Sequence, residues 1–253
     1  MKPNRKPLIA GNWKMHKTCS EAEITASDVV RLTADIQGID LMIAPPFIAL
    51  SALSRIVSKT QVALGAQNMF WENEGAYTGE ISPPMIVSVG CSYAIIGHSE
   101  RRQHFGETDE SVNKKMHAAV ENDLTPVFCI GESESQREAG ETFSVLDKQI
   151  QNGLKSLSLN QVKKLVVAYE PVWAIGTGKT ATREQAQEVH HYLRIQLKKL
   201  YDESFAESVR ILYGGSVKPD NISGLMEMPD VDGALIGGAS LDAETFSAIA
   251  HYK

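Results

Sequence analysis

Short apolar runs alternate with amphipathic stretches along this whole sequence, and this alternation restricts the possible folds more than any other feature. The apolar runs lie at residues 7–12, 40–45, 61–67, 93–97, 125–131, 164–170, 209–215 and 233–238. Strands that alternate with helices form a parallel sheet, and strands buried on both faces are apolar throughout. Eight such units in 253 residues predict one (β/α)8 barrel domain over residues 1–253, with a doubly wound open sheet as the structural alternative.

Helix start signals lie between several of these runs. Ser20–Glu23 and Thr182–Gln185 have the spacing of a capping box, and Ser82 is a candidate cap with Pro83 in the first helical turn. The residues that share one helical face after the first box are Ala22, Ala26, Val29, Val30 and Thr33. Helices are predicted near residues 47–57, 109–122, 142–154, 182–201, 219–226 and 242–249.

The composition excludes several classes of function. A formal net charge of −6 and the lack of a long cationic run argue against a nucleic-acid partner. The three cysteines, Cys19, Cys91 and Cys129, are widely spaced and odd in number, which favours a reducing cytosol over a disulfide framework. We recognise no signal peptide or membrane span, so we expect a cytoplasmic enzyme or binding protein with no membrane partner.

Polar and small residues gather where the predicted strands end, which is where barrels of this kind carry functional groups. These strand ends carry Asn12, Lys14, His98, Glu100, Glu170, the segment 213–216 and Gly237–Gly238. Each has a simpler explanation alone: Lys14 could be a solvated charge, His98 a structural histidine, and Glu170 a hydrogen-bond acceptor. Their coincidence at one rim indicates a functional site.

Five segments in chain order carry a resemblance to a known family. They are AGNWK (10–14), IIGHSERR (95–102), AYEPVWAIGTGK (168–179), LYGGSV (212–217) and GALIGGASL (233–241). On these motifs the sequence resembles the triosephosphate isomerase family, from Ala10 to Leu241. His16 stands where many relatives have asparagine, but it is not one of the reacting groups. The resemblance implies a TIM barrel with a parallel eight-stranded sheet.

The family interconverts dihydroxyacetone phosphate and D-glyceraldehyde 3-phosphate by proton transfer through an enediol(ate), as an aldose–ketose isomerase of glycolysis and gluconeogenesis. By resemblance, Glu170 is the base for the carbon-bound proton, and His98 is the electrophile that shuttles protons between the substrate oxygens. The family is a standard example of a histidine kept neutral by a helix N-terminus, and residues 99–102 could begin that helix here.

The resemblance also implies how the substrate is bound. Lys14 would supply positive charge, and Asn12 a hydrogen bond near a substrate oxygen. Glu100 resembles a further catalytic-site carboxylate that pairs with Lys14, although a structural salt bridge would explain it as well. The phosphate would be held mainly by backbone N–H groups at Gly176, Ser216, Gly237 and Gly238. The reaction needs no redox cofactor, and the seven histidines form no recognisable metal-ligand motif, so we expect neither cofactor nor metal.

Other interpretations compete with this one. A Walker A loop ending at Lys179–Thr180 would need glycine at the position of Trp173, so that match fails. The Gly176–Gly178 pair resembles part of a dinucleotide fingerprint, but it begins six positions after Glu170 rather than directly after a strand. A different enzyme on a phosphate-binding barrel stays possible on fold alone, because barrels host many chemistries.

The long segment 67–80, QNMFWENEGAYTGE, could instead make the chain a non-catalytic interaction module. Its Met69, Phe70 and Trp71 are costly to leave exposed. In the family this loop reaches a neighbouring subunit near the Lys14 region. We therefore expect a homodimer through residues 67–80, with each site chemically within one chain.

Residues 171–179 resemble a lid over the site. The segments PVW and GTGK would be its hinges, and Ala174–Thr177 its tip. The family is a standard example of such loop closure, which excludes water from the reaction.

Overall fold

The computed structural model describes residues 5–176 and 179–253. Its strands form a closed parallel barrel, in which each strand pairs with its neighbours in sequence and β1 pairs with β8. The strands are β1 (Leu8–Asn12), β2 (Asp40–Ala44), β3 (Val62–Ala66), β4 (Cys91–Ile96), β5 (Thr125–Ile130), β6 (Val166–Tyr169), β7 (Arg210–Tyr213) and β8 (Gly233–Ile236). The predicted (β/α)8 barrel is confirmed, and the open doubly wound sheet is excluded.

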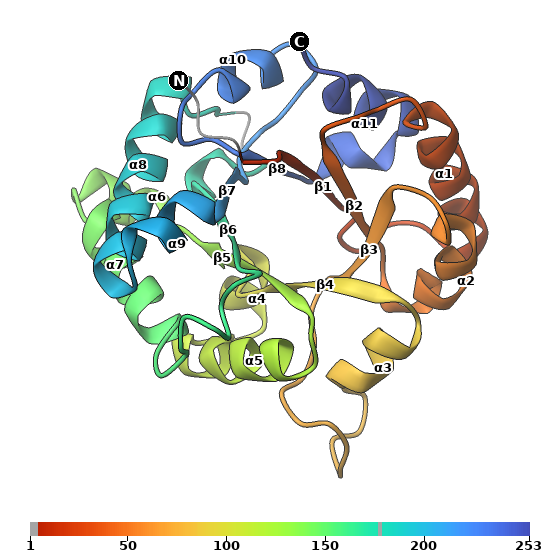
Figure 1. The fold of residues 1–253 in the computed structure, drawn as a ribbon, viewed down its shortest axis with the longest axis horizontal. Coiled ribbons are helices and arrows are strands. Elements are labelled where there is room, and N and C mark those ends of the chain that lie inside the picture. The colour runs from red at the N-terminus through yellow and green to blue at the C-terminus, as the bar shows by residue number, and fades with distance from the viewer. Residues whose placement is uncertain (1–4, 177–178) are drawn as a thin grey trace.

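Helices form a ring around this barrel (Figure 1). They are α1 (Cys19–Leu32), α2 (Phe47–Val57), α3 (Pro83–Ser88), α4 (Ser99–His104), α5 (Asp109–Glu121), α6 (Glu134–Glu138), α7 (Thr142–Gly153), α8 (Arg183–Leu200), α9 (Glu203–Ser208), α10 (Ile222–Met226) and α11 (Ala243–Ala250), with short 3₁₀ turns at Val172–Ala174 and Gly238–Leu241. Within the described ranges, no helix combines the length and the apolar character needed to cross a membrane.

The strands are buried on both faces. In β1, Leu8 and Ala10 belong to the apolar cluster inside the barrel, whereas Ile9 belongs to the cluster between the sheet and the helices. Leu8 pairs with Asp40 on one side and with Gly233 on the other, so β1 has a hydrogen-bonded neighbour on each edge. Burial of both faces is the reason that the strands are continuous apolar runs in the sequence.

The capping box predicted at Ser20–Glu23 is wrong. The helix α1 begins at Cys19, and its cap is Thr18, whose hydroxyl accepts the Glu21 N–H at 3.5 Å. The Glu21 carboxylate in turn accepts the Thr18 N–H at 2.8 Å. Both positions fit the pattern of Ser or Thr followed three residues later by Glu, so the pattern alone does not choose between two starts that differ by two residues.

Of the other two predicted helix starts, one has its capping hydrogen bonds and one does not. The capping box at Thr182–Gln185 is confirmed at the start of α8. Ser82 occupies the cap position of α3, with Pro83 in the first turn, but its hydroxyl makes no capping hydrogen bond. The short helices α6 and α9 were not predicted, because five or six residues carry too little periodicity to be recognised.

The connection between β3 and α3 extends beyond the ring of helices (Figure 1). Part of its apolar surface is covered by the chain itself: Met69 is fully buried, and Phe70 stacks on Trp71 with ring centroids 4.0 Å apart. Lys114 lies 5.3 Å above the Trp71 ring, whereas Tyr77 is 44% exposed. The apolar surface left for a partner is therefore smaller than the sequence of this loop indicates.

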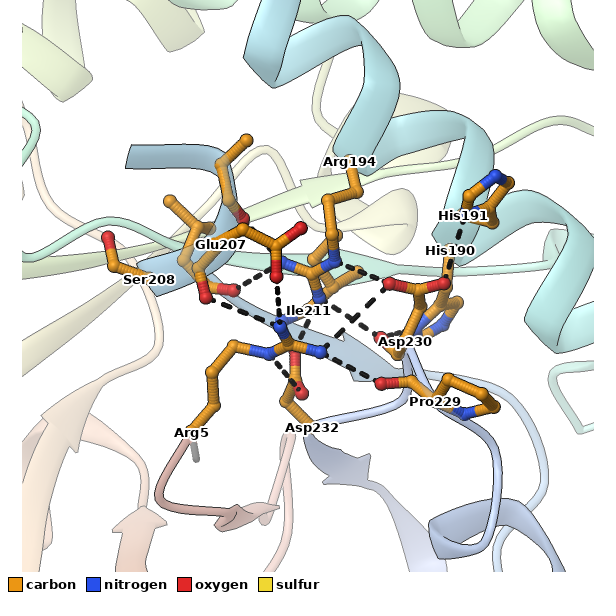
Figure 2. Close-up of polar contacts among 12 residues, drawn as sticks. Arg5, His190, His191, Arg194, Glu207, Ser208, Ile211, Pro229, Asp230 and Asp232 are labelled. Atoms are coloured by element: carbon orange, nitrogen blue, oxygen red, sulfur yellow. Dashed lines mark hydrogen bonds and ion pairs between the residues drawn. The ribbon is translucent and has the colours of Figure 1, made fainter. Parts of the chain in front are cut away.

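A buried charge network holds the opposite, amino-terminal end of the barrel together (Figure 2). Asp232, directly before β8, accepts Arg5 Nε at 2.6 Å, Arg194 Nη2 at 2.7 Å and the Ile211 N–H at 3.0 Å. Arg194 also donates through Nε to Asp230 at 2.6 Å. The network connects α8 and the segment before β1 to the strands β7 and β8.

Replacement of Asp232 by alanine is expected to lower the free energy of unfolding by about 3–5 kcal/mol, because two buried guanidinium groups would lose the carboxylate they share. Equilibrium denaturation in urea measures this change. Asp35→Ala is the control, since that carboxylate is 79% exposed and pairs only at the surface with His251. A loss for Asp232→Ala no larger than that of the control would contradict the structural role of the network.

Candidate active site

A pocket of about 260 Å³ opens at the carboxyl-terminal ends of the strands. The predicted site residues in its wall are Asn12, Lys14, His98, Glu170, Gly176, Ser216, Gly237 and Gly238. They lie at or after the ends of β1, β4, β6, β7 and β8. Glu100 is not part of the wall, but its Oε1 accepts a hydrogen bond from Lys14 Nζ at 2.6 Å. The barrel therefore gathers the predicted residues from both ends of the sequence at one site.

Glu170 follows β6 and is only 2% exposed. Its carboxylate accepts the Ser99 N–H at 2.9 Å and the Ser99 hydroxyl at 3.2 Å, and it lies 3.0 Å from His98 Nε2. Burial raises the pKa of the Glu170 carboxyl, but His98 and the Ser99 donors outweigh burial, so the pKa lies below its usual range. In this arrangement Glu170 is an ionised carboxylate that can accept a proton.

His98 is the N-cap residue of α4, which confirms the helix expected at residues 99–102. Its Nδ1 accepts the Glu100 N–H at 3.3 Å, so the neutral ring carries its proton on Nε2, facing Glu170. Burial lowers the pKa of His98, but the Glu170 carboxylate raises it more, and the net pKa lies above its ordinary value. The Glu100 N–H acts against protonation, because a charged ring would direct a second N–H at it.

Lys14 has a left-handed backbone, with φ of 52°, which is strained for a residue other than glycine. Its N–H donates to Asn12 Oδ1 at 3.0 Å, and its carbonyl accepts from Gln67 Nε2 at 2.8 Å. The side chain crosses Gly237, where an added Cβ would lie 3.1 Å from Lys14 Cε. The small residue at position 237 therefore leaves room for the lysine, whose charge is paired with Glu100.

The far side of the pocket is built from turns and backbone. Gly176 has φ of 70°, a conformation that glycine adopts without strain. The Gly237 carbonyl accepts from the Ser240 N–H at 2.8 Å and the Ser240 hydroxyl at 2.7 Å, which orders the turn after β8. Lys218 adds a second cation to the wall. Two lysines and several glycine-rich turns make this pocket suited to a small anion.

Besides Lys218, two residues with contacts at or beside the site were missed in the sequence. Ser99 holds the Glu170 carboxylate and lies inside a motif that was recognised, directly after His98. Glu132 follows β5 and is fully buried; its Oε1 accepts from Trp173 Nε1 at 2.9 Å and from the Tyr169 hydroxyl at 3.1 Å. A carboxylate directly after an apolar strand is the signal that could have found Glu132.

The predicted lid at residues 171–179 is described in part. Val172–Ala174 form a 3₁₀ turn, and Trp173 in the first hinge is bonded to Glu132. Lys179 in the second hinge pairs with Glu134 of α6. Thr177, at the predicted tip, and Gly178 lie outside the described residues.

No group of three or more His, Cys, Asp or Glu side chains is arranged to hold a metal ion in residues 5–176 and 179–253. The three cysteines are free thiols, with Cys19 exposed and Cys91 and Cys129 buried. Burial raises the pKa of Cys91 to about 12, so this thiol stays protonated at neutral pH.

Comparison with known proteins gives one family. A sequence profile described as triosephosphate isomerase matches residues 7–253. A triosephosphate isomerase of Geobacter metallireducens is 55% identical over 249 residues, which cover 98% of this chain and 99% of the relative. The triosephosphate isomerases of Caldanaerobacter subterraneus subsp. tengcongensis and Moorella thermoacetica are each 54% identical, over 98% of this chain and 100% and 99% of their own lengths.

Proposed function

The chain belongs to the triosephosphate isomerase family, and we propose that the pocket at the carboxyl-terminal ends of its strands is the active site. Its activity is that of the family: it is an intramolecular isomerase of glycolysis and gluconeogenesis, which interconverts dihydroxyacetone phosphate and D-glyceraldehyde 3-phosphate. The site assignment is carried by one observation, that Lys14, His98 and Glu170 line the same pocket although they are far apart in sequence.

Glu170 is the base in this proposal. It takes the proton from C1 of dihydroxyacetone phosphate, and the electron pair of that C–H bond forms the C1–C2 double bond of the enediolate. The same carboxyl group returns the proton to C2, which completes the isomerisation. To reach the substrate, the carboxylate has to leave the Ser99 donors that lower its pKa. Loss of these bonds in a buried site raises its proton affinity, which makes it a stronger base.

His98 moves protons between the two substrate oxygens. Its Nε2–H donates to the oxygen on C2 as negative charge develops there, and the ring then takes the proton from the oxygen on C1. The raised pKa of His98 depends mainly on direct contact with Glu170, with a smaller effect from the Glu100 carboxylate, whose Oε2 lies 3.7 Å from Nδ1. A substrate lying between His98 and Glu170 removes their contact. Burial and the Glu100 N–H on Nδ1 then favour the neutral ring, an effect for which this family is a standard example.

Positive charge and hydrogen bonds stabilise the enediolate. Lys14 Nζ places its charge beside the pocket, and the ion pair with Glu100 holds it there. Asn12 supports the strained Lys14 backbone through Oδ1, and its amide N–H groups are available to a substrate oxygen in the pocket. Fixed charges of this kind are effective because they need no reorganisation when charge develops.

The phosphate is bound at the glycine-rich side of the pocket. Gly176, Ser216, Gly237 and Gly238 line this side and offer backbone N–H groups at close approach. This placement follows the general pattern of barrels, in which the last two connections hold phosphate. It allows a chain with net charge −6 to bind an anionic substrate, because the attraction is local.

Glu170→Asp is expected to fold normally and to lose about 10²-fold or more in turnover, because a side chain shortened by one methylene displaces the base by about 1 Å. A coupled assay of glyceraldehyde 3-phosphate isomerisation measures this loss. Glu188→Asp, an exposed site on α8, is the matched control and should keep full turnover. If Glu170→Asp turned over as fast as this control, Glu170 would not be the base.

Lys14→Met is expected to raise KM and to lower kcat by at least about tenfold each, since the positive charge acts on both the bound phosphate and the enediolate. The melting temperature should stay close to that of the unmodified chain. Lys163→Met removes an exposed lysine and serves as the control. Unchanged kinetic constants in Lys14→Met would refute its electrostatic role.

We propose further that residues 1–253 form one barrel domain that assembles as a homodimer through residues 67–80. The most exposed large apolar side chains in the described ranges are Met15, Ile48 and Phe105, at 94%, 70% and 68%. They belong to segments that follow β1, β2 and β4, the same part of the chain that carries the protruding loop after β3. A second copy that covers these side chains would remove them from water.

Sedimentation at micromolar concentration is expected to give twice the mass of the chain. Met15→Asp should shift the equilibrium to monomer, because a charge would enter the covered surface. Ile195→Asp, a partly exposed position on α8, should leave the dimer intact. A fully active monomer for the unmodified chain would contradict the assembly.

The cytoplasm is the proposed location of the chain. This proposal is supported by its membership in a family of glycolytic enzymes and by its three free cysteines.

A further inference from the structure

The turn that places His98 is held by two side chains to which the mechanism gives no role. Gly97, directly before His98, has φ of 76°, in the left-handed region. Its N–H donates to Glu107 Oε1 at 2.9 Å, and its carbonyl accepts from Arg102 Nε at 2.8 Å. Both polar groups of this glycine are therefore bonded to side chains, which fix the direction in which the chain leaves β4.

Arg102 is itself anchored to the next helix. Its Nη1 donates to Asp109 Oδ1 at 2.6 Å, in the first turn of α5. The guanidinium also lies against the turn, because a Cβ added at Gly97 would be 3.0 Å from Arg102 Nη2 and 3.0 Å from the Cys129 carbonyl. The turn is thus enclosed between Arg102 and β5, with little room to rotate.

We propose that Arg102 is a positioning residue, which orients the His98 imidazole by holding the Gly97 carbonyl. This inference rests on the proposed role of His98 as the electrophile. The Gly97 carbonyl and the His98 N–H belong to one planar peptide unit. The hydrogen bond from the Glu100 N–H to His98 Nδ1 selects the tautomer with its proton on Nε2. Rotation of the peptide unit turns the His98 backbone and carries Nδ1 away from this N–H, so the tautomer is no longer selected.

The simpler alternative is that Arg102 only stabilises the fold through its ion pair with Asp109. The two explanations differ in what a lysine can replace. A lysine ammonium can still pair with the Asp109 carboxylate, but it lacks the rigid fork that reaches a carboxylate and a carbonyl through separate nitrogens. Arg102→Lys therefore retains the charge and loses the defined geometry.

Arg102→Lys is expected to lower kcat about tenfold while KM changes less than about twofold, because His98 acts in the chemical step and the phosphate contacts stay in place. Nitrogen NMR of ¹⁵N-labelled histidine, recorded with a substrate analogue bound so that the Glu170 contact is replaced, should show a protonated Nε2 and an unprotonated Nδ1 for His98 in the unmodified enzyme. In the variant the two shifts should move toward each other as the tautomers mix. Unchanged kcat together with unchanged shifts would overturn the proposal.

Arg210→Lys is the matched control. Arg210 has the same side-chain exposure as Arg102, 18%, and the same 2.6 Å ion-pair distance, but its partner is Asp40 at the other end of the barrel. This control should keep kcat and the His98 shifts. An equal loss of kcat in both variants would overturn the proposal, because the effect would then be one of general stability.

His98→Gln separates this inference from the proposed function. If His98→Gln keeps full turnover, the electrophile assignment fails, and the NMR shifts of Arg102→Lys still decide whether Arg102 orients the ring. If Arg102→Lys does not fold, Asp109→Asn replaces it, since that change releases the far end of Arg102. A loss in kcat of about threefold at constant KM is then expected, and no loss would overturn the proposal.

Discussion

Hydrogen bonding between β1 and β8 is the constraint on which the rest of the structure depends. It closes the sheet, so that no strand edge is left open, and it brings the last connection of the chain beside the first. Lys14 crosses Gly237 only because these two ends of the sheet meet. In an open sheet β1 and β8 would not be neighbours, so Lys14 would lie apart from the glycine-rich turn after β8. Closure therefore creates the pocket as well as the fold.

The short helix α4 organises most of the charge inside that pocket. Ser99 donates to the Glu170 carboxylate, Glu100 pairs with Lys14, and the Glu100 N–H sets the tautomer of His98. A buried charge without a partner is costly, so each of these groups depends on its neighbours. The bonds from Ser99 and the contact with His98 keep the Glu170 carboxylate ionised, because together they outweigh the effect of burial on its pKa. The ionised groups around the pocket are in this way connected to one another through one helix.

Much of the fold and the site could be predicted because the signals are local. A strand buried on both faces is recognisable as a continuous apolar run, and Glu170 is recognisable because it ends one. The missed features depend on contacts between distant segments. The sequence pattern allows a capping box at Thr18 or at Ser20, and the structure has it at Thr18. Glu132 gains its role from Tyr169 and Trp173, which only the neighbouring strand β6 brings to it.

The sequence by itself determined the number and order of the βα units, the family, and eight of the residues that line the pocket. These depend on periodicity and on short motifs, which are properties of neighbouring residues. Apart from the ion pair of Lys14 with Glu100, which the resemblance implied, only the tertiary structure decided which groups touch. The bonds from Ser99 to Glu170 and from Arg102 to Gly97 arise because α4 folds back over the end of its own strand and β6 lies nearby. Distances and protonation depend on burial and on partners from elsewhere in the chain, and neither is contained in a motif.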